Sequence, residues 1–266
     1  MKHGVVAALL LALAACAHAL RTPPPLEKIA PPPEAGTEQL LARADEAWSR
    51  RADLAQAETA EELYLQAARA DPRNAPAYAG AIRAKAFRRP FRDRCGKPWR
   101  GWDGGKRGQL AADAVAVGQL CEQNAAPSPL CDYWLAAALG LQARERSSTG
   151  HDALPHMVDL LHKAAAADPP VDHGGPHRLL AILLLRAPGW PMGPGDVEAA
   201  LPEARAAATI APGYPPNQLA VGEALRKNGH PDEARAAYAE ALRLATADSA
   251  DPDSAGWADE ARAALR

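Results

Sequence analysis

The sequence predicts an all-α protein whose helices stack in pairs as an α-solenoid. Alanine and leucine dominate the apolar residues, β-branched residues are sparse, and aromatic residues make up only 5% of the chain. Alanine and leucine lose little conformational freedom in a helix, whereas β-branched residues lose more. From Glu38 onward a helical pattern is interrupted at regular intervals by Pro, Gly or Asn, and no stretch alternates apolar and polar residues for long enough to predict a strand.

About five helix pairs and a C-terminal capping helix are expected in residues 37–266. The pairs are 38–52 with 56–70, 75–88 with 107–123, 131–145 with 152–168, 175–187 with 196–210, and 215–228 with 231–246; the last helix is 254–265. Asp196 is placed to cap one helix, and Pro72, Pro169 and Pro212 stop three others. The charged residues beside the apolar face of the last helix are typical of the cap that a solenoid needs.

The three proline stops are preceded by similar residues at the same offsets. These residues are Ala60, Tyr64 and Ala67 before Pro72, Ala200, Ala204 and Ala207 before Pro212, and Met157, Leu161 and Ala164 before Pro169. In the most complete unit, residues 215–248, small side chains at Gly222, Ala234 and Ala241 allow two helices to nest, and Tyr238 is expected to fill the gap to the next pair. This pattern resembles the tetratricopeptide repeat, a helix pair of about 34 residues. The alternative is an irregular helical bundle.

The N-terminal residues predict export and lipid attachment. Lys2 and His3 precede an apolar run over residues 5–15, which is shorter than the roughly 20 residues that a membrane-spanning helix needs. Such a run fits a secretory signal segment. Its end, Leu13-Ala14-Ala15-Cys16, resembles the bacterial lipobox, in which the cysteine is acylated and becomes the first mature residue. The alternative is an ordinary signal peptide cut after Ala17 or Ala19.

The expected organisation is therefore a signal peptide at 1–15, an acylated tether at 16–36 and the repeat domain at 37–266. Proline runs in the tether favour an extended, semi-rigid spacer. Because Ala17 and not Asp follows Cys16, resemblance to Gram-negative lipoproteins implies the periplasmic side of the outer membrane. The acyl group is then the only expected membrane contact.

Three further cysteines, Cys95, Cys121 and Cys131, can form a disulfide in an exported protein. Cys121 lies near the end of one expected helix and Cys131 at the start of the next. A helical hairpin brings these ends together, so Cys121–Cys131 is the preferred bridge. The alternatives are three free thiols or a pair that includes Cys95.

Two segments interrupt the repeat pattern. Residues 91–107 combine six Lys or Arg residues with Trp99 and Trp102, which can suggest nucleic acid. Net charge is only −2, however, and an exported protein meets no nucleic acid as a rule, so a glycine-rich connection with two packed tryptophans is preferred. Residues 187–196 form a Pro/Gly-rich loop inside one helix pair, and long compact loops in a rigid array are often functional.

Residues 105–245 and the lipobox resemble the T-component family of tripartite ATP-independent periplasmic (TRAP) transporters. The stretches that carry the resemblance are Tyr133-Trp134 with Ala136, Ala137 and Gly140; Arg186-Ala-Pro-Gly with Gly195-Asp196, Ala200 and Ala204; and Ala211-Pro-Gly-Tyr214. The resemblance implies an acylated periplasmic protein with cryptic tetratricopeptide repeats that forms oligomers and docks a solute-binding protein. The Pro-rich tether, the cysteine pair and the 91–107 segment depart from that family.

Sequence motifs for catalysis are absent. The chain has no Gly-x-Ser-x-Gly, P-loop, dinucleotide fingerprint or His-Glu-x-x-His motif. His173 and His177 have a metal-ligand spacing, but Gly174, Gly175 and Pro176 lie between them and oppose a continuous helix. We therefore expect no enzyme activity, cofactor or metal. An enzyme of unknown class remains the third alternative, after a scaffold and a transport accessory.

A protein partner is expected on the concave face, which the first helix of each pair lines in such solenoids. The candidate contact residues are Tyr133, Trp134, Arg144, His177, Arg178, Arg186 and Trp190. Tyr, Trp and Arg are common interface anchors. Packing between helices is the alternative for Tyr133 and Trp134, and a solvated helix-end cation is the alternative for Arg144. Arg178 and Arg186 lie eight positions apart, so they could share an anion or a peptide carboxylate.

Overall fold

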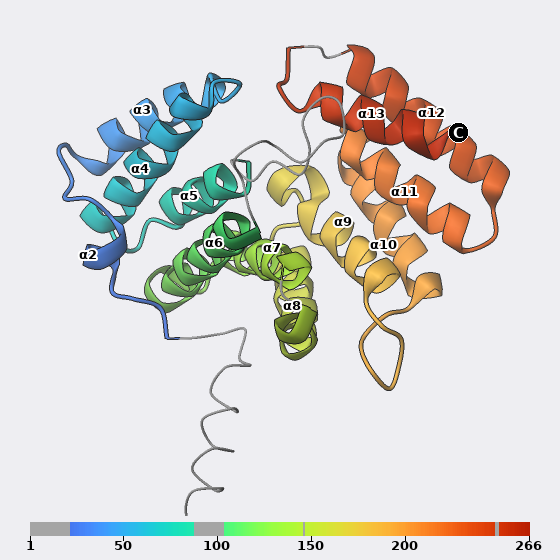
Figure 1. Cartoon of the computed structure of the whole chain (residues 1–266), viewed down its shortest axis with the longest axis horizontal. Coiled ribbons are helices and arrows are strands. Elements are labelled where there is room, and N and C mark those ends of the chain that lie inside the picture. Colours follow the sequence, from blue (N-terminus) through green and yellow to red (C-terminus); the bar gives the residue numbers. More distant parts are fainter. Residues whose placement is uncertain (1–21, 88–103, 146, 248–249) are drawn as a thin grey trace, which may run out of the picture.

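The computed structural model describes residues 22–87, 104–145, 147–247 and 250–266, and the elements that these residues form are helices joined by turns and loops (Figure 1). The helix pairs are α3 Thr37–Ser49 with α4 Leu54–Ala70, α5 Ala75–Phe87 with α6 Gly104–Ala125, α7 Pro129–Glu145 with α8 Ser147–Ala167, α9 Val171–Arg186 with α10 Val197–Ile210, and α11 Pro215–Lys227 with α12 Pro231–Ala247; α2 Leu26–Ile29 precedes them and α13 Ser254–Ala264 follows. The predicted all-α solenoid of about five pairs with a capping helix is confirmed.

Local sequence explains where these helices start and stop. The carboxylate of Asp196 accepts a hydrogen bond from Ala199 N at 2.9 Å, and that of Asp53 accepts one from Ala55 N at 3.0 Å. These caps satisfy backbone donors that have no partner inside the helix. Pro72 and Pro212 each follow the end of a helix by two residues, as predicted.

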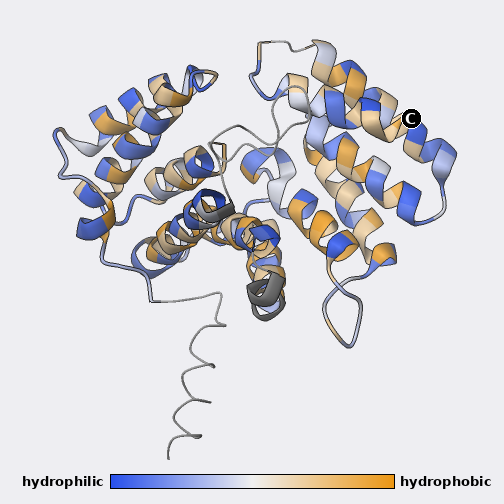
Figure 2. Cartoon of the chain, in the orientation of Figure 1, coloured by the Kyte–Doolittle hydropathy of each residue, from blue (hydrophilic) through white to orange (hydrophobic). Residues whose placement is uncertain are grey.

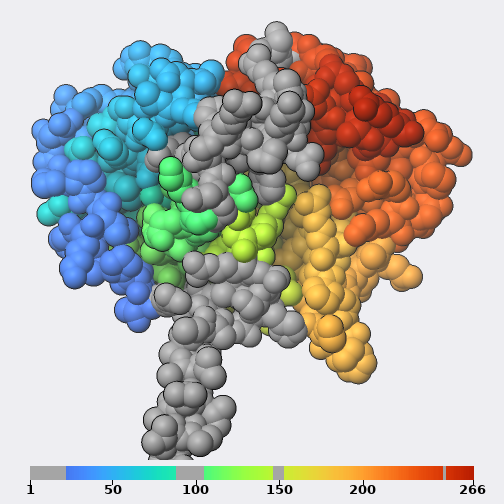
Figure 3. All heavy atoms as spheres, in the orientation of Figure 1, coloured from blue at the N-terminus to red at the C-terminus, as the bar shows by residue number. Residues whose placement is uncertain are grey.

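From α3 onward each helix packs against the next one, and from α5 onward the first helices of successive pairs also touch. Contacts join α5 to α7, α7 to α9, α9 to α11, and α11 to α13, so these helices form one continuous inner layer. The buried residues fall into two clusters, one over α2 to α9 and one over α9 to α13. Figure 3 shows the corresponding ends of the chain, blue to cyan and orange to red, as two lobes on either side of the middle helices.

Glycine–tyrosine contacts set the spacing between packed helices. A Cβ atom at Gly80 would lie 2.6 Å from the ring of Tyr64, one at Gly175 would lie 2.6 Å from Tyr133, and one at Gly222 would lie 2.6 Å from Tyr238. Tyr238 was expected to fill the gap to the next pair. Its ring instead occupies the space left by Gly222 within its own pair, because glycine leaves room for an aromatic ring at that level.

A kink divides α9 near its start. Asp172, His173 and Gly174 have φ values of 48°, 58° and 79°, so the chain passes through the left-handed region before the straight part of the helix begins. Glycine adopts this region freely, whereas Asp and His do so at a cost. The sequence pattern starts this helix at residue 175, just after the kink.

The end of the tether is not a free spacer. Leu26 and Ala30 are buried in the N-terminal cluster, and Arg69 of α4 donates to the carbonyl of Ala30 at 2.9 Å. The prediction of an extended spacer over 16–36 is therefore wrong for residues 26–30, because one apolar turn within the Pro-rich segment finds a hydrophobic site on α4.

Within the described part of the chain, no helix is both long enough and apolar enough to cross a bilayer. Figure 2 shows hydrophilic and hydrophobic residues interleaved along every helix. Such interleaving is typical of helices that bury one face and expose the other.

Candidate protein-binding groove

A groove of about 290 Å³ lies on the inner layer and crosses the first helices of the first four pairs. Its lining residues are Leu41 and Asp45 of α3, Tyr64 of α4, Pro76, Ala79, Gly80 and Arg83 of α5, Leu130 and Trp134 of α7, and Asp172 of α9. Apolar side chains thus alternate with acids, an arginine and two aromatic rings. The groove is open, and helices hold each of these residues in place.

The N-terminal wall of the groove is a hydrogen-bonded set of polar residues. Tyr64 donates to Asp45 Oδ1 at 2.5 Å, and Arg83 Nη2 donates to the Tyr64 hydroxyl at 3.0 Å. The Arg83 guanidinium also lies 4.5 Å from the centre of the Trp48 ring. Burial, followed by the hydrogen bond to Asp45, raises the pKa of Tyr64 well above its usual value, so its proton is retained and the set stays fixed.

The opposite wall is set by Asp172 at the α9 kink. Tyr133 donates to Asp172 Oδ2, and Arg178 Nη2 donates to the same oxygen at 2.6 Å. Arg178 Nη1 donates to Asn217 Oδ1 at 2.9 Å and to the carbonyl of Asp172 at 3.1 Å. Arg178 therefore neutralises the charge of the Asp172 carboxylate and also provides a hydrogen-bond donor for the backbone carbonyl at the kink.

Asn217 completes this network from α11. It is fully buried, and its Nδ2 donates to the carbonyls of His173 and Ala207, each at 2.9 Å. The amide thus joins the kink of α9 to the end of α10. Buried polar groups need such partners because desolvation without them is costly.

Of the predicted contact residues, Tyr133 and Trp134 lie on this wall, but only Trp134 lines the groove. Tyr133 is buried and bonded to Asp172, whereas half-buried Trp134 stands edge-on to the Tyr133 ring with centroids 5.0 Å apart. Arg178 is only 8% exposed. We therefore leave Tyr133 and Arg178 out of the binding surface and keep Trp134.

The remaining predicted residues lie away from the groove. Arg186 pairs with Glu223 through Nη2 at 2.7 Å, so the hypothesis that Arg178 and Arg186 share one anion is wrong: each faces its own carboxylate. Arg144 is exposed at the end of α7, close enough to Glu260 for their charges to interact. His177 Nδ1 lies 2.6 Å from Glu203 Oε2.

Trp190 is at the tip of the loop between α9 and α10 and is 90% exposed. Cys121 and Cys131 form a disulfide whose Cα atoms are 5.4 Å apart. Cys16, Cys95, Trp99 and Trp102 lie outside the described residues. No group of three potential metal ligands occurs among the residues that the structure describes.

Sequence reasoning missed Leu41, Asp45, Tyr64 and Arg83 as groove residues. The sequence pattern identifies Tyr64 only as a repeat position, although its ring edge packs on Gly80 while its hydroxyl reaches the groove. The signal in the sequence was the recurrence of charged residues, such as Asp45 and Arg83, on the first helices of the pairs. That signal becomes specific only once the stacking of the helices is known.

Comparison with known proteins supports the architecture. No family model matches the sequence, and no curated protein matches it. Among solved structures, TTC0263, a tetratricopeptide-repeat protein of Thermus thermophilus, is similar over 86% of this chain and 98% of its own, with a TM-score of 0.61 and 17% identity. A structure of MamA matches over 80% of this chain and 93% of its own, with a TM-score of 0.44 and 17% identity. The likeness to TTC0263 shows that this chain has the fold of a tetratricopeptide-repeat solenoid.

Proposed function

We propose that the protein is a non-enzymatic scaffold that binds a protein partner in the groove on its inner layer. The observation that carries this proposal is the groove itself, which offers Trp134, Leu41 and Leu130 beside the fixed polar residues Asp45, Tyr64 and Arg83. Apolar side chains of an extended partner segment can pack on the three apolar residues. The backbone amides and charged groups of that segment can pair with the three polar residues.

We further propose that acylated Cys16 holds this scaffold at the periplasmic side of the outer membrane. The lipobox supports the anchor, and the Cys121–Cys131 disulfide fits an oxidising compartment. Cys16→Ala is expected to release the protein from washed membranes. Unchanged membrane retention, together with an unacylated N-terminal peptide in mass spectrometry, would contradict the anchor.

A photo-crosslinking amino acid at position 41 or 134 tests the groove in cells of the native host. We expect both positions to capture the same protein. The matched control is position 209, because Thr209 is exposed on α10, a second helix away from the groove. Capture of the same protein at 209 with equal yield, or no capture at 41 and 134, would overturn the proposal.

The resemblance to TRAP T-components supplies a narrower candidate, an accessory that docks a solute-binding protein, with a homo-oligomer as the assembled form. The structure gives one supporting observation: two of the stretches that carry the resemblance meet at the α9 kink. Tyr133 bonds Asp172, and the Arg178 guanidinium lies 5.0 Å from the centre of the Tyr214 ring. Identification of the protein captured at position 134 decides this candidate, since any partner other than a solute-binding protein contradicts it.

A further inference from the structure

The loop between α9 and α10 has a fixed shape. Gly195 N donates to the carbonyl of Pro188 at 2.8 Å, and Asp196 N donates to that of Leu184 at 3.0 Å, which closes the base of the loop. A Cβ at Gly195 would overlap the carbonyl oxygen of Ala187, so the two arms pass each other at a distance that only glycine permits. Met192 N donates to the carbonyl of Gly189 at 3.0 Å and tightens the tip.

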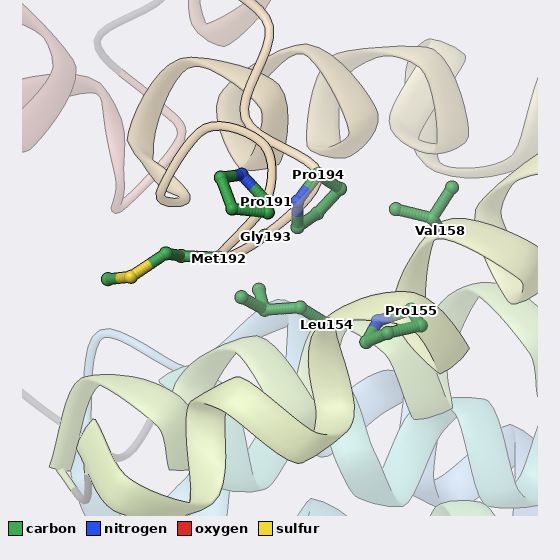
Figure 4. Close-up of a pocket in the computed structure, with 7 residues that line it drawn as sticks. All are labelled: Leu154, Pro155, Val158, Pro191, Met192, Gly193 and Pro194. Atoms are coloured by element: carbon green, nitrogen blue, oxygen red, sulfur yellow. The ribbon is translucent and has the colours of Figure 1, made fainter.

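This tip carries two large apolar side chains that are exposed to solvent. Trp190 is 90% exposed and Met192 is 62% exposed. Figure 4 shows Leu154 and Val158 of α8 facing the loop and Met192 extending out of the cleft between them. The cleft, about 680 Å³, is lined by those residues, Pro155 and residues 191–194, and none of these described lining residues is charged. Contiguous exposed apolar surface of this kind indicates an interaction site.

The loop and the start of the chain lie on the same edge of the molecule. In Figure 1 the loop projects from the lower edge, and the blue segment that leads into α2 reaches the same edge. Cys16 precedes the first described residue, Thr22, by six positions, and an extended chain of that length spans at most roughly 22 Å. An acyl group on Cys16 would therefore keep this edge close to the bilayer.

We propose that residues 188–195 form a second membrane contact, with Trp190 and Met192 inserted in the interfacial layer of the bilayer that holds Cys16. The inference rests on the lipid anchor proposed above. Tryptophan is enriched at the membrane interface because its ring is apolar and its N–H still reaches water or headgroups. Residues 187–195 carry no charge that would need to be removed from water. Contact at both the anchor and the loop would fix which way the groove faces.

Brominated phospholipids test the loop directly, since bromine quenches only those tryptophans that enter the bilayer. The acylated full chain, purified from membranes, is reconstituted into vesicles of brominated phosphatidylethanolamine and phosphatidylglycerol. The wild-type chain has six tryptophans, so W190F reports position 190 by difference, and W257F is the matched control on α13. We expect W190F to lose at least half of the quenching seen in the wild type, and W257F to retain it.

Equal quenching in all three proteins would overturn the inference, as would a partner protein that crosslinks at position 190 while Trp190 stays unquenched. Circular dichroism of W190F confirms that the exposed substitution leaves the fold intact. The anchor is tested separately by the mass of the N-terminal peptide. If that peptide proves unacylated, the anchor proposal fails, and the loop is tested by cosedimentation of the unacylated chain with the same vesicles. Equal cosedimentation of the wild type and W190A/M192A would reject the membrane contact of the loop. A loss of at least half of the cosedimentation in the variant would support that contact.

Discussion

Arg51 and Asp251 are 200 positions apart in the sequence, yet Arg51 Nη2 lies 2.8 Å from Asp251 Oδ1. The same nitrogen lies 3.4 Å from Asp253 Oδ2. Arg51 is in the turn between α3 and α4, and both carboxylates are in the segment that leads to α13. This contact joins the first helix pair to the capping helix, so the solenoid closes on itself at this point.

Replacement of Arg51 by Met should loosen this closure. The Arg51 side chain is largely buried and its guanidinium also lies 4.8 Å from the Trp48 ring centre, so methionine retains part of the packing and loses the charge. Burial raises the pKa of Asp253, and the charge of Arg51 opposes that rise, so we expect the pKa to increase further in the variant. Carboxyl NMR titration measures this shift.

The raised pKa of Asp253 determines how the free energy of unfolding changes with pH. A folded-state pKa above the unfolded value means that the folded protein binds the proton more tightly, so this stabilisation is present at low pH and is lost as pH rises through the folded pKa. R51M should therefore lose more stability than the wild type between pH 4 and pH 7. A wild-type profile in R51M, with an unchanged radius of gyration by small-angle scattering, would contradict a role for the contact.

Gly222→Ala should destabilise the last complete helix pair. The new Cβ would lie 2.6 Å from the buried ring of Tyr238, and overpacking of this kind costs about 1–3 kcal/mol. Gly256→Ala is the control, because Gly256 lies in α13 with open space around it, and alanine favours a helix by up to about 1 kcal/mol. Urea unfolding measures both, and Tyr238→Leu should restore part of the loss in G222A.

Arg178→Met should be severely destabilising, by about 3–5 kcal/mol, because it leaves the Asp172 carboxylate partly buried without a counter-ion. Asp172→Asn also removes the counter-ion of buried Arg178, so it should destabilise too, although by less. Asparagine tolerates the left-handed φ of 48° at this position and keeps an oxygen that Tyr133 and Arg178 can use. Equal losses in the two variants, measured by thermal unfolding, would show that the oxygen kept by asparagine does not replace the carboxylate as a partner of Arg178.

Alkaline pH should weaken the α9–α11 junction through Tyr214. Burial, followed by the charge of Asp172, raises the pKa of Tyr214 to about 12. The proton is therefore held more tightly in the folded state, and stability should fall as pH rises from about 10 to 12. Tyr214→Phe keeps the ring stacked 4.4 Å from His173 and should make this fall shallower. Circular dichroism monitors unfolding of both proteins across this pH range. An equally steep fall in the stability of Y214F would assign the loss to other groups.

The helices and their pairing were determined by the sequence alone. Alanine-rich periodic segments, acidic caps such as Asp196 and prolines such as Pro212 act within one or two turns, so their effects can be read without tertiary contacts. The disulfide partners and the break before residue 175 were likewise local, because Cys121 and Cys131 flank one turn and Gly174 favours the left-handed region.

Only the tertiary structure decided which side chains face a partner. Arg178 and Arg186 look equivalent in the sequence, yet Arg178 is buried on Asp172, whereas Arg186 pairs with Glu223 at the surface. Tyr64 and Arg83 belong to different pairs and meet only because α4 and α5 stack. The physical reason is that a helical repeat specifies its spacing through small and aromatic residues close in sequence, whereas the groove and the closure depend on charged residues brought together from different helix pairs.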